Sequence, residues 1–502
     1  MPPDHPMPSA SRLRIPFSNT YAGLPDRFFA RVEPSPVPAP GLVRVNRGLA
    51  RQLGIDPDAL ESPEGLAVLA GNVVPEGAEA IALAYAGHQF GNFSPQLGDG
   101  RALLLGEVVA EDGRRYDIQL KGSGPTPFSR RGDGRAALGP VLREYLIGEA
   151  MAAFGIPTSR ALAAVTTGAR VLRETALPGA VLARVAASHI RVGTFQFFAA
   201  RSDVDAVRTL ADYTIARHYP ELADGEAPYP AFLEAVVARQ AELVARWLLV
   251  GFIHGVMNTD NMAISGETID YGPCAFMDAY DPATVFSSID HAGRYAYGNQ
   301  PRIVAWNMAR LAETLLPLLG AEQDAAIARA QDILAGFGPR FEAAYFSGLR
   351  RKIGIEGSRD GDDALAQDLL KQMAEGGADF TLTFRALCAS AEGTDGDVAL
   401  HALFKDPSAF DGWLAAWRAR LAQESGTAAE RAAAMRAVNP LYIPRNHLVE
   451  EALAAAVSQG DYEPFEALLD VITRPFAERQ GLERFTLPPE PEQRVVQTFC
   501  GT

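Results

Sequence analysis

The spacing of apolar and polar residues changes period several times along this chain of 502 residues. Two β-rich runs, Arg101 to Val109 and Arg115 to Lys121, flank Glu111-Asp112-Gly113, and together they predict a β-hairpin. Helical spacing follows from about Pro140 to Phe154, where Gly155-Ile156-Pro157 ends the predicted helix. Strand-like patterns then return in three runs, which are Ala161 to Val165, Ala169 to Glu174 and Val181 to Ser188.

Beyond residue 202 the pattern is mainly helical. A long amphipathic helix is predicted from Tyr229 to Phe252, and it leads directly into a polar stretch that begins at His254. Two short strands are expected between Met262 and Ile269, around the turn Ser265-Gly266. Later helices are predicted at Ile303 to Leu319, at Gln323 to Leu349 and, rich in Ala and Arg, onward to about Gly460.

Together, these predicted strands and helices indicate a mixed α/β fold of the α+β class. The first 95 residues carry many prolines and predict an irregular arm with short helices, for example from Val43 to Leu53. His88 is expected to be a hydrogen-bonded structural histidine. The stretch from Asn439 to Asn446 is expected to be a packing element. Four tryptophans are expected in the core, and they are Trp247, Trp306, Trp413 and Trp417.

The polar stretch His254-Gly255-Val256-Met257-Asn258-Thr259-Asp260-Asn261 is followed nine residues later by Asp270-Tyr271-Gly272. Against the protein-kinase pattern H-R-D-L-x-x-x-N and D-F-G, the His, the Asn and the second Asp match, with Tyr271 in place of Phe. Val256 occupies the position of the catalytic Asp, and a valine cannot accept a proton. A carboxylate stands instead at Asp260. The pattern therefore predicts that Asn261 and Asp270 are retained as a metal-binding pair and that the catalytic base is Asp260 rather than residue 256. The oxygens of such a pair suit Mg²⁺, which takes its other ligands from waters and phosphates.

Upstream lie residues suited to phosphate. Gly98 and Gly100 precede the first strand of the predicted hairpin, and Lys121 ends the second. Backbone N–H groups of a glycine-rich turn can approach phosphates, and a lysine at a strand end can reach them as a point charge. Lys121 is the only lysine in the first 350 residues, although the chain has 46 lysines and arginines. A glutamate on the following helix would orient it, and the residues alone make Glu144 and Glu149 near equal candidates.

Arginines offer further contacts with an anion. The loop from Gly122 to Arg135 is polar, rich in glycine and long for a simple connection, which favours a functional loop. Arg184 and Arg191 lie in apolar, strand-rich sequence, where a guanidinium needs a partner to offset its desolvation. That partner is either a phosphate or a structural carboxylate, and the residues alone leave both interpretations open.

Four short motifs stand out beside the catalytic stretch: His88-Gln89-Phe90-Gly91, Gly98-Asp99-Gly100-Arg101, Gln119-Leu120-Lys121-Gly122-Ser123-Gly124 and Ile269-Asp270-Tyr271-Gly272-Pro273. Together, and in this order, they resemble the signatures of the selenoprotein O family. The resemblance runs from about Pro16 to Cys500. That family consists of pseudokinase-like enzymes that transfer AMP, rather than phosphate, from ATP to protein hydroxyls.

The resemblance implies a protein-kinase-like two-lobed core with an N-terminal arm (residues 1–95), an N-lobe-like nucleotide-binding region (96–200), a C-lobe-like region with the catalytic loop (201–340) and a helical C-terminal extension with a mobile tail (341–502). It implies ATP as substrate, bound in a flipped orientation, with Mg²⁺ or Mn²⁺. Asp260 would accept the hydroxyl proton, Asn261 and Asp270 would bind the metal, and Glu144 would orient Lys121. The residues implied at the nucleotide are Gly98, Gly100, Arg101, Lys121, Asp133, Gly134, Arg184, Arg191 and Asp270.

Composition narrows the class of protein. An apolar fraction of 48% and a charged fraction of 21% are those of a soluble globular protein. The net charge of −15 argues against nucleic acid as the main partner. No apolar run reaches the roughly 18 residues of a membrane span, and the N-terminus lacks the apolar region of a secretory signal. Composition therefore predicts a cytoplasmic protein without nucleic acid or membrane as partners. The family resemblance implies ATP and proteins bearing Ser, Thr or Tyr hydroxyls as its partners, and we expect a monomer.

Two other functions remain open. A small-molecule phosphotransferase of aminoglycoside-kinase type also uses a His-Gly loop, but its catalytic base would be an aspartate at the position of Val256. A non-catalytic nucleotide-binding pseudokinase scaffold would not need to retain both metal ligands.

Three cysteines are too few for a disulfide scaffold. Family members often carry a cysteine or selenocysteine near the C-terminus, and Cys274 directly follows Asp270-Tyr-Gly-Pro. The resemblance therefore suggests a reversible disulfide between Cys274 and Cys500 that locks the tail against the active-site segment. Two unrelated thiols are the alternative.

Overall fold

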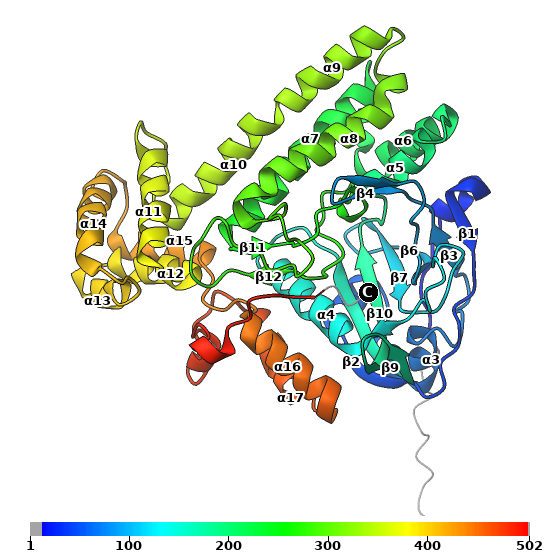
Figure 1. Cartoon of the computed structure of the whole chain (residues 1–502), viewed down its shortest axis with the longest axis horizontal. Coiled ribbons are helices and arrows are strands. Elements are labelled where there is room, and N and C mark those ends of the chain that lie inside the picture. Colours follow the sequence, from blue (N-terminus) through cyan, green and yellow to red (C-terminus); the bar gives the residue numbers. More distant parts are fainter. Residues whose placement is uncertain (1–12, 500–502) are drawn as a thin grey trace, which may run out of the picture.

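The computed structural model describes residues 13–499, in which an antiparallel sheet lies beside a large helical region (Figure 1). This arrangement confirms the α+β class. The main sheet is eight-stranded, with the order β1-β3-β6-β7-β10-β9-β2 and with β8 paired to β10. Its strands are β1 Phe29–Arg31, β2 Gly41–Val45, β3 Ile81–Leu83, β6 Ala102–Val109, β7 Arg115–Lys121, β8 Ala136–Ala137, β9 Arg160–Leu172 and β10 Ala176–Ala186.

The predicted hairpin is confirmed and forms the centre of this sheet. Strands β6 and β7 pair antiparallel, and Gly113 takes a φ of 77° in the turn between them. On the other side of β7, Lys121 lies opposite Leu182 of β10, and Gln119 lies opposite Arg184. Because directly opposite residues of an antiparallel pair share a face, the register puts Lys121 and Arg184 on the same side of the sheet.

The N-terminal region contributes more regular structure than the sequence predicts. Strands β1, β2 and β3 all precede residue 95 and all belong to the main sheet. The helix predicted from Val43 to Leu53 is half wrong, because Val43 lies in β2 and helix α1 occupies only Arg47–Gln52. The side chain of Asn46 caps that helix by accepting a hydrogen bond from the backbone N–H of Leu49. A separate hairpin follows, made of β4 Gly87–Gln89 and β5 Asn92–Ser94.

Two predictions about strands are corrected by the structure. The runs around Ala161 and Ala169 form one continuous strand, β9, which passes through Gly168 at a φ of 71°. No pair of strands forms between Met262 and Ile269, where a single antiparallel bridge joins Met262 to Thr268. The pair that brackets the catalytic stretch is instead β11 Phe252–Ile253 with β12 Ala275–Phe276.

Helix α4, Leu138–Ala153, confirms the helix predicted after the hairpin. It packs against β9 and β10 and also contacts the late helices α16, Asn446–Gln459, and α17, Glu463–Ile472. Helix α7, Pro228–Leu249, confirms the long helix before the catalytic stretch. It packs against α8, Gln300–Leu319, and α10, Phe337–Lys352. The remaining helices are α2 Pro57–Glu61, α3 Pro63–Leu69, α5 Val192–Ala199, α6 Val204–His218, α9 Gln323–Ala335, α11 Asp362–Gly376, α12 Phe380–Ser390, α13 Asp397–His401, α14 Pro407–Leu421 and α15 Ala428–Val438.

Large aromatic side chains fill the core beneath this framework. Trp247, Trp413 and Trp417 are buried, as predicted, and the indole N–H of Trp247 donates to Thr268 Oγ1 at 2.8 Å. Trp306 is the exception, because it is only half-buried on helix α8. Among the described residues, no helix combines the length and the apolar character that a membrane span requires.

The stretch from Asn439 to Asn446 is a packing element, as predicted. The Arg445 guanidinium is 1% exposed and forms ion pairs with Asp278 at 2.7 Å and with Asp379 at 2.6 Å. The side-chain amide of Asn446 bonds both the N–H and the C=O of Phe276 in β12. These contacts fix the helical C-terminal region to the segment that follows the catalytic stretch.

Lys352 is buried in the helical core, and this gives a testable pH dependence. Its Nζ lies 4.1 Å from the ring centroid of Phe384, and burial lowers its pKa from 10.5 to about 7. Between these two values the unfolded chain binds more protons than the folded one, so this residue makes stability rise with pH. We expect Lys352→Met to raise the free energy of unfolding at pH 6 by about 1–3 kcal/mol and to flatten the rise above pH 7.

Thermal unfolding at pH 6, 7.5 and 9 checks this expectation. The matched control is Lys371→Met, because the Lys371 side chain is 67% exposed and should shift the unfolding temperature little. A Lys352→Met protein that unfolds at a lower temperature than the wild type at pH 6 would contradict the reasoning.

Candidate active site

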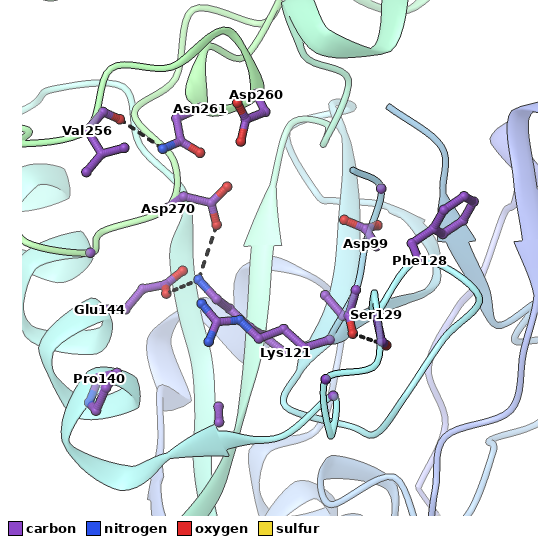
Figure 2. A pocket seen from close by; sticks show the side chains of 18 of the residues that line it. Asp99, Lys121, Phe128, Ser129, Pro140, Glu144, Val256, Asp260, Asn261 and Asp270 are labelled. Atoms are coloured by element: carbon purple, nitrogen blue, oxygen red, sulfur yellow. Dashed lines mark hydrogen bonds and ion pairs between the residues drawn. The ribbon is translucent and has the colours of Figure 1, made fainter. Parts of the chain in front are cut away.

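A cavity of about 960 Å³ opens between the main sheet, the loop from Gly122 to Arg135 and the catalytic stretch. Figure 2 shows residues of this cavity facing one another from both sides. It brings together every residue that the sequence and the family resemblance suggested for catalysis, metal and nucleotide: Gly98, Gly100, Arg101, Lys121, Asp133, Gly134, Glu144, Arg184, Arg191, Asp260, Asn261 and Asp270.

The geometry separates the two candidate glutamates on α4. Lys121 Nζ lies 2.6 Å from Glu144 Oε2 and 3.1 Å from Asp270 Oδ1 (Figure 2). Glu149 instead pairs with Arg160 at 2.6 Å and accepts a hydrogen bond from Asn46. Glu144 is therefore the partner of Lys121, and Glu149 fastens α4 to β9.

Asp270 is the most strongly paired carboxylate of the cavity. Besides Lys121, it contacts Arg184 at 2.6 Å and Arg191 at 2.6 Å. Its backbone φ is +59°, a left-handed conformation that aspartate adopts more readily than most residues. Burial by itself would raise the pKa of this carboxyl, but Arg184, Arg191 and Lys121 together hold it well below its usual range. Asp270 is therefore ionised at neutral pH.

The structure also gives partners for the two arginines that the sequence left open. Arg184, 2% exposed, contacts Glu144 at 3.0 Å and donates two hydrogen bonds to Gln119 Oε1. Arg191 donates to the backbone C=O of Asp260 at 2.6 Å and stacks on the ring of Tyr85 at 4.6 Å. Both guanidinium groups thus have structural carboxylate partners while they line the cavity, and phosphate binding by them remains a prediction.

Asp260 has the features of a general base. It lies in the short 3₁₀ turn Thr259–Asn261 and is 8% exposed, and its Oδ1 is buried without a hydrogen-bond partner in the described part of the chain. Its Oδ2 accepts a hydrogen bond from Gln89 Nε2 at 3.3 Å. Burial raises the pKa of this carboxyl to about 6, close to the range in which a base works best at neutral pH. Val256, 8% exposed, offers no such group.

The glycines have a steric role that the sequence did not reveal. A Cβ on Gly98, whose φ is +72°, would lie 2.3 Å from the ring of Phe128. The hydroxyl of Thr126 donates to the backbone C=O of Asp99 at 2.6 Å, and that of Ser129 donates to the C=O of Gly100. Gly98 and Gly100 therefore let the loop from Gly122 to Arg135 close onto the segment just before β6.

Gly134 and Asp133 have distinct places in that loop. A Cβ on Gly134, at a φ of +65°, would lie 2.1 Å from the backbone of Gly124, so only glycine allows the two ends of the loop to meet. Asp133 is exposed and pairs with Arg173 at 2.9 Å. It therefore stands at the mouth of the cavity rather than at its floor.

Sequence reasoning missed two polar residues of the site. Gln89 belongs to a motif that was singled out without a role, and the β4–β5 hairpin carries it to Asp260. Asp99 lies between the two glycines, 3% exposed, and burial raises its pKa to about 6. Its carboxylate accepts hydrogen bonds from the N–H of Leu83 and from Gln119. Nothing in the linear pattern shows that Asp99 would be buried or that Gln89 would reach Asp260, because both depend on which segments meet in the fold.

The donor set fits a hard divalent cation. The Asn261 side-chain N–H donates to the backbone C=O of Val256 at 2.8 Å, and Figure 2 shows its amide oxygen on the side of Asp270. One carboxylate and one amide oxygen suit Mg²⁺ when phosphates and waters complete the shell. Among residues 13–499 no cluster of three or more His, Cys, Asp or Glu side chains could hold a metal alone. The residues present therefore fit a metal ion that binds together with a nucleotide, whose phosphates would supply further ligands.

The cavity has cations at one side, an ionised carboxylate at its centre and a second, buried carboxylate at the other side. Such an arrangement is typical of enzymes that transfer part of a nucleotide to an acceptor. The comparison with known proteins agrees with this class. Residues 11–473 match the family model described as protein adenylyltransferase SelO. The chain therefore belongs to the SelO family.

Individual relatives cover nearly the whole chain. The protein nucleotidyltransferase YdiU of Bradyrhizobium diazoefficiens is 66% identical over 490 residues, which are 98% of this chain and 100% of that protein. The YdiU protein of Methylorubrum populi is 66% identical over 494 residues, covering 97% and 99%. That of Rhodopseudomonas palustris strain BisB5 is 63% identical over 490 residues, covering 98% and 100%.

Proposed function

We propose that this protein is a Mg²⁺-dependent adenylyltransferase that moves AMP from ATP to Ser, Thr or Tyr hydroxyls of proteins. The observation that carries the proposal is Asp260, a buried carboxylate with an unbonded Oδ1 that stands beside Asn261 while Val256 occupies the kinase base position. A base displaced in this way would meet an acceptor hydroxyl from a different direction than in a kinase. Membership of the SelO family supports the same chemistry.

In the proposed reaction the acceptor oxygen attacks the α-phosphorus of ATP, which is bound in a flipped orientation. The new bond between the acceptor oxygen and the α-phosphorus forms as the bond between the α-phosphorus and the oxygen that bridges to the β-phosphate breaks. Pyrophosphate leaves with the electron pair of the broken bond. Asp260 takes the hydroxyl proton. Lys121, oriented by Glu144, and the two buried arginines hold phosphates and stabilise the charge that develops on them. Mg²⁺ held by Asn261 and Asp270 would supply further positive charge to the phosphates.

The architecture that we propose for this chemistry is a kinase-like pair of lobes. The main sheet with Lys121 and α4 with Glu144 would form the nucleotide-binding lobe at residues 96–200. The catalytic stretch and the helices around α7 would form the second lobe at residues 201–340, with the arm before residue 96 and the helical extension after residue 340. We also predict that the protein is a monomer and that it acts in the cytoplasm.

Two radiolabelled ATP samples test the proposed reaction. Label at the α-phosphate should enter protein on Ser, Thr or Tyr, including self-modification, and each event should add the mass of one AMP. Label at the γ-phosphate should stay out of protein. Transfer of γ-label would make this protein a kinase with a relocated base. Transfer of neither label with Mg²⁺ or Mn²⁺ across many acceptors would favour the non-catalytic scaffold.

We also propose that Cys274 and Cys500 form the reversible disulfide. Cys500 lies outside the described residues, but the segment just before it supports the idea. Thr498 donates through Oγ1 to the backbone C=O of Pro273 at 2.6 Å, next to the buried Cys274. Its N–H also donates to the C=O of Phe286. Peptide mapping of oxidised protein without reductant checks the pairing, and activity that ignores reductant would count against a regulatory role.

A further inference from the structure

A surface beside the catalytic stretch gathers rings and guanidinium groups that the proposed chemistry does not use. It consists of His88 and Phe93 from the β4–β5 hairpin, Arg294, and Trp306 and Arg310 from α8, and we name it the rim platform. Trp306 is only half-buried, and Phe93 is 41% exposed. Side chains of this size that remain open to solvent often mark binding surfaces.

The rings and cations of the rim platform stack on one another. The His88 ring lies 4.9 Å from that of Phe93 and 5.3 Å from that of Trp306. The guanidinium carbons of Arg294 and Arg310 each lie 4.9 Å from the centroid of the Trp306 ring. Stacking on an aromatic face holds a guanidinium flat and limits the side-chain freedom it would lose on binding. The rim platform is therefore preorganised.

The charge of the rim platform is only partly compensated. Arg310 pairs with Glu313 at 2.7 Å. Arg294 forms no ion pair with any carboxylate among residues 13–499, and its Nε is buried without a hydrogen-bond partner. The nearby Asp290 carboxylate accepts instead from the backbone N–H groups of Arg294 and Tyr295. A guanidinium without a carboxylate partner among residues 13–499 is thus retained in a chain whose net charge is −15.

Hydrogen bonds join the rim platform to the proposed base. Asn258 Oδ1 accepts from Tyr295 Oη at 2.8 Å and from the N–H of Phe90 at 3.1 Å. The N–H of His88 donates to Thr259 Oγ1 at 2.6 Å, and Gln89, next along the hairpin, donates to Asp260. The rim platform therefore lies on the side of Asp260, where an acceptor hydroxyl must arrive.

We propose that the rim platform binds the segment of the acceptor protein that flanks the modified hydroxyl, and that this segment is acidic. The proposal rests on the adenylyltransferase function above and adds the class of acceptor to it. A carboxylate is the group that an unpaired, stacked Arg294 recognises best, because the planar fork donates two parallel hydrogen bonds to it. Trp306 and Phe93 offer apolar area for the neighbouring side chains.

Binding of two labelled peptides tests this inference independently of catalysis. Both are twelve residues long with one central threonine, flanked by three Asp in one and by three Lys in the other. With a non-hydrolysable ATP analogue and Mg²⁺ present, fluorescence anisotropy should give the wild type at least tenfold tighter binding of the Asp peptide. Arg294→Glu should abolish or reverse this preference, and Trp306→Ala should weaken binding of the Asp peptide. Affinity for the ATP analogue should not change in either variant.

Arg208→Glu is the matched control, because Arg208 is an exposed arginine that also stacks on a ring, that of Tyr229, but is not part of the rim platform. It should retain the preference. Equal binding of both peptides by the wild type, or an unchanged preference in Arg294→Glu, overturns the proposal. A twelve-residue oligothymidine that binds more tightly than the Asp peptide also overturns it and assigns the rim platform to single-stranded nucleic acid.

The α-label experiment keeps this proposal separate from the proposed function. If α-label is transferred to proteins but neither peptide is preferred, the acidic acceptor is rejected and the adenylyltransferase function is supported. If the Asp peptide is clearly preferred but no α-label is transferred, the acidic-segment binding surface is supported and the adenylyltransferase function is rejected.

Discussion

The Asp260→Asn variant is expected to lose AMP transfer while it retains nearly all of its affinity for ATP. The substitution keeps the shape of the side chain and removes only the ability to take a proton, so the loss in kcat should be at least about 100-fold. Asp260 makes no ion pair with Lys121 or with the buried arginines that face the nucleotide side of the cavity. Calorimetry with Mg²⁺ and ATP, together with α-label transfer, measures both quantities.

Asp270→Asn is the informative comparison for this variant. It removes the carboxylate that Lys121, Arg184 and Arg191 share, and it leaves these buried cations with fewer partners. We expect it to lose both nucleotide binding and transfer, and to lower the free energy of unfolding by about 3–5 kcal/mol. If both variants are folded at the temperature of the calorimetry and lose the same ATP affinity, Asp260 cannot be assigned as a base that acts apart from the nucleotide.

The second large effect is expected at Lys121. Lys121→Met should weaken ATP binding at least tenfold, or about 1.4 kcal/mol, and lower kcat as well, because a positive charge in the cavity is lost while Glu144 keeps Arg184 as a partner. Lys121→Arg should restore little, since a planar fork cannot take the position of a compact ammonium between Glu144 and Asp270.

The exposed Lys405 provides the control for the loss of one positive charge. Lys405→Met should leave ATP affinity and transfer at wild-type values. Unchanged ATP affinity in Lys121→Met, measured by the same calorimetry, would show that Lys121 only supports the position of Glu144 and Asp270.

Much of the framework around the site was readable from the sequence. The β6–β7 hairpin, α4 and α7 are long segments with clear periodicity and local stop signals, so local rules predict them well. The strands β1 and β3 were missed because each has only three residues, too few to show a period. Trp306 was placed in the core by its residue type, but two arginines and a histidine hold it at the surface.

The sequence by itself determined which chemical groups are candidates for the proposed site: a lysine at a strand end, Asn261 and Asp270 as the proposed metal pair, and a carboxylate at Asp260, four residues after the Val256 that occupies the kinase base position. Such motifs are local in the chain, and residue type and spacing are enough to identify them. Only the tertiary structure decided that Glu144 rather than Glu149 meets Lys121, and that Arg184 and Arg191 have carboxylate partners. These pairings join residues on different strands and helices, and the free energy of burying each charge depends on its neighbours in space rather than in sequence.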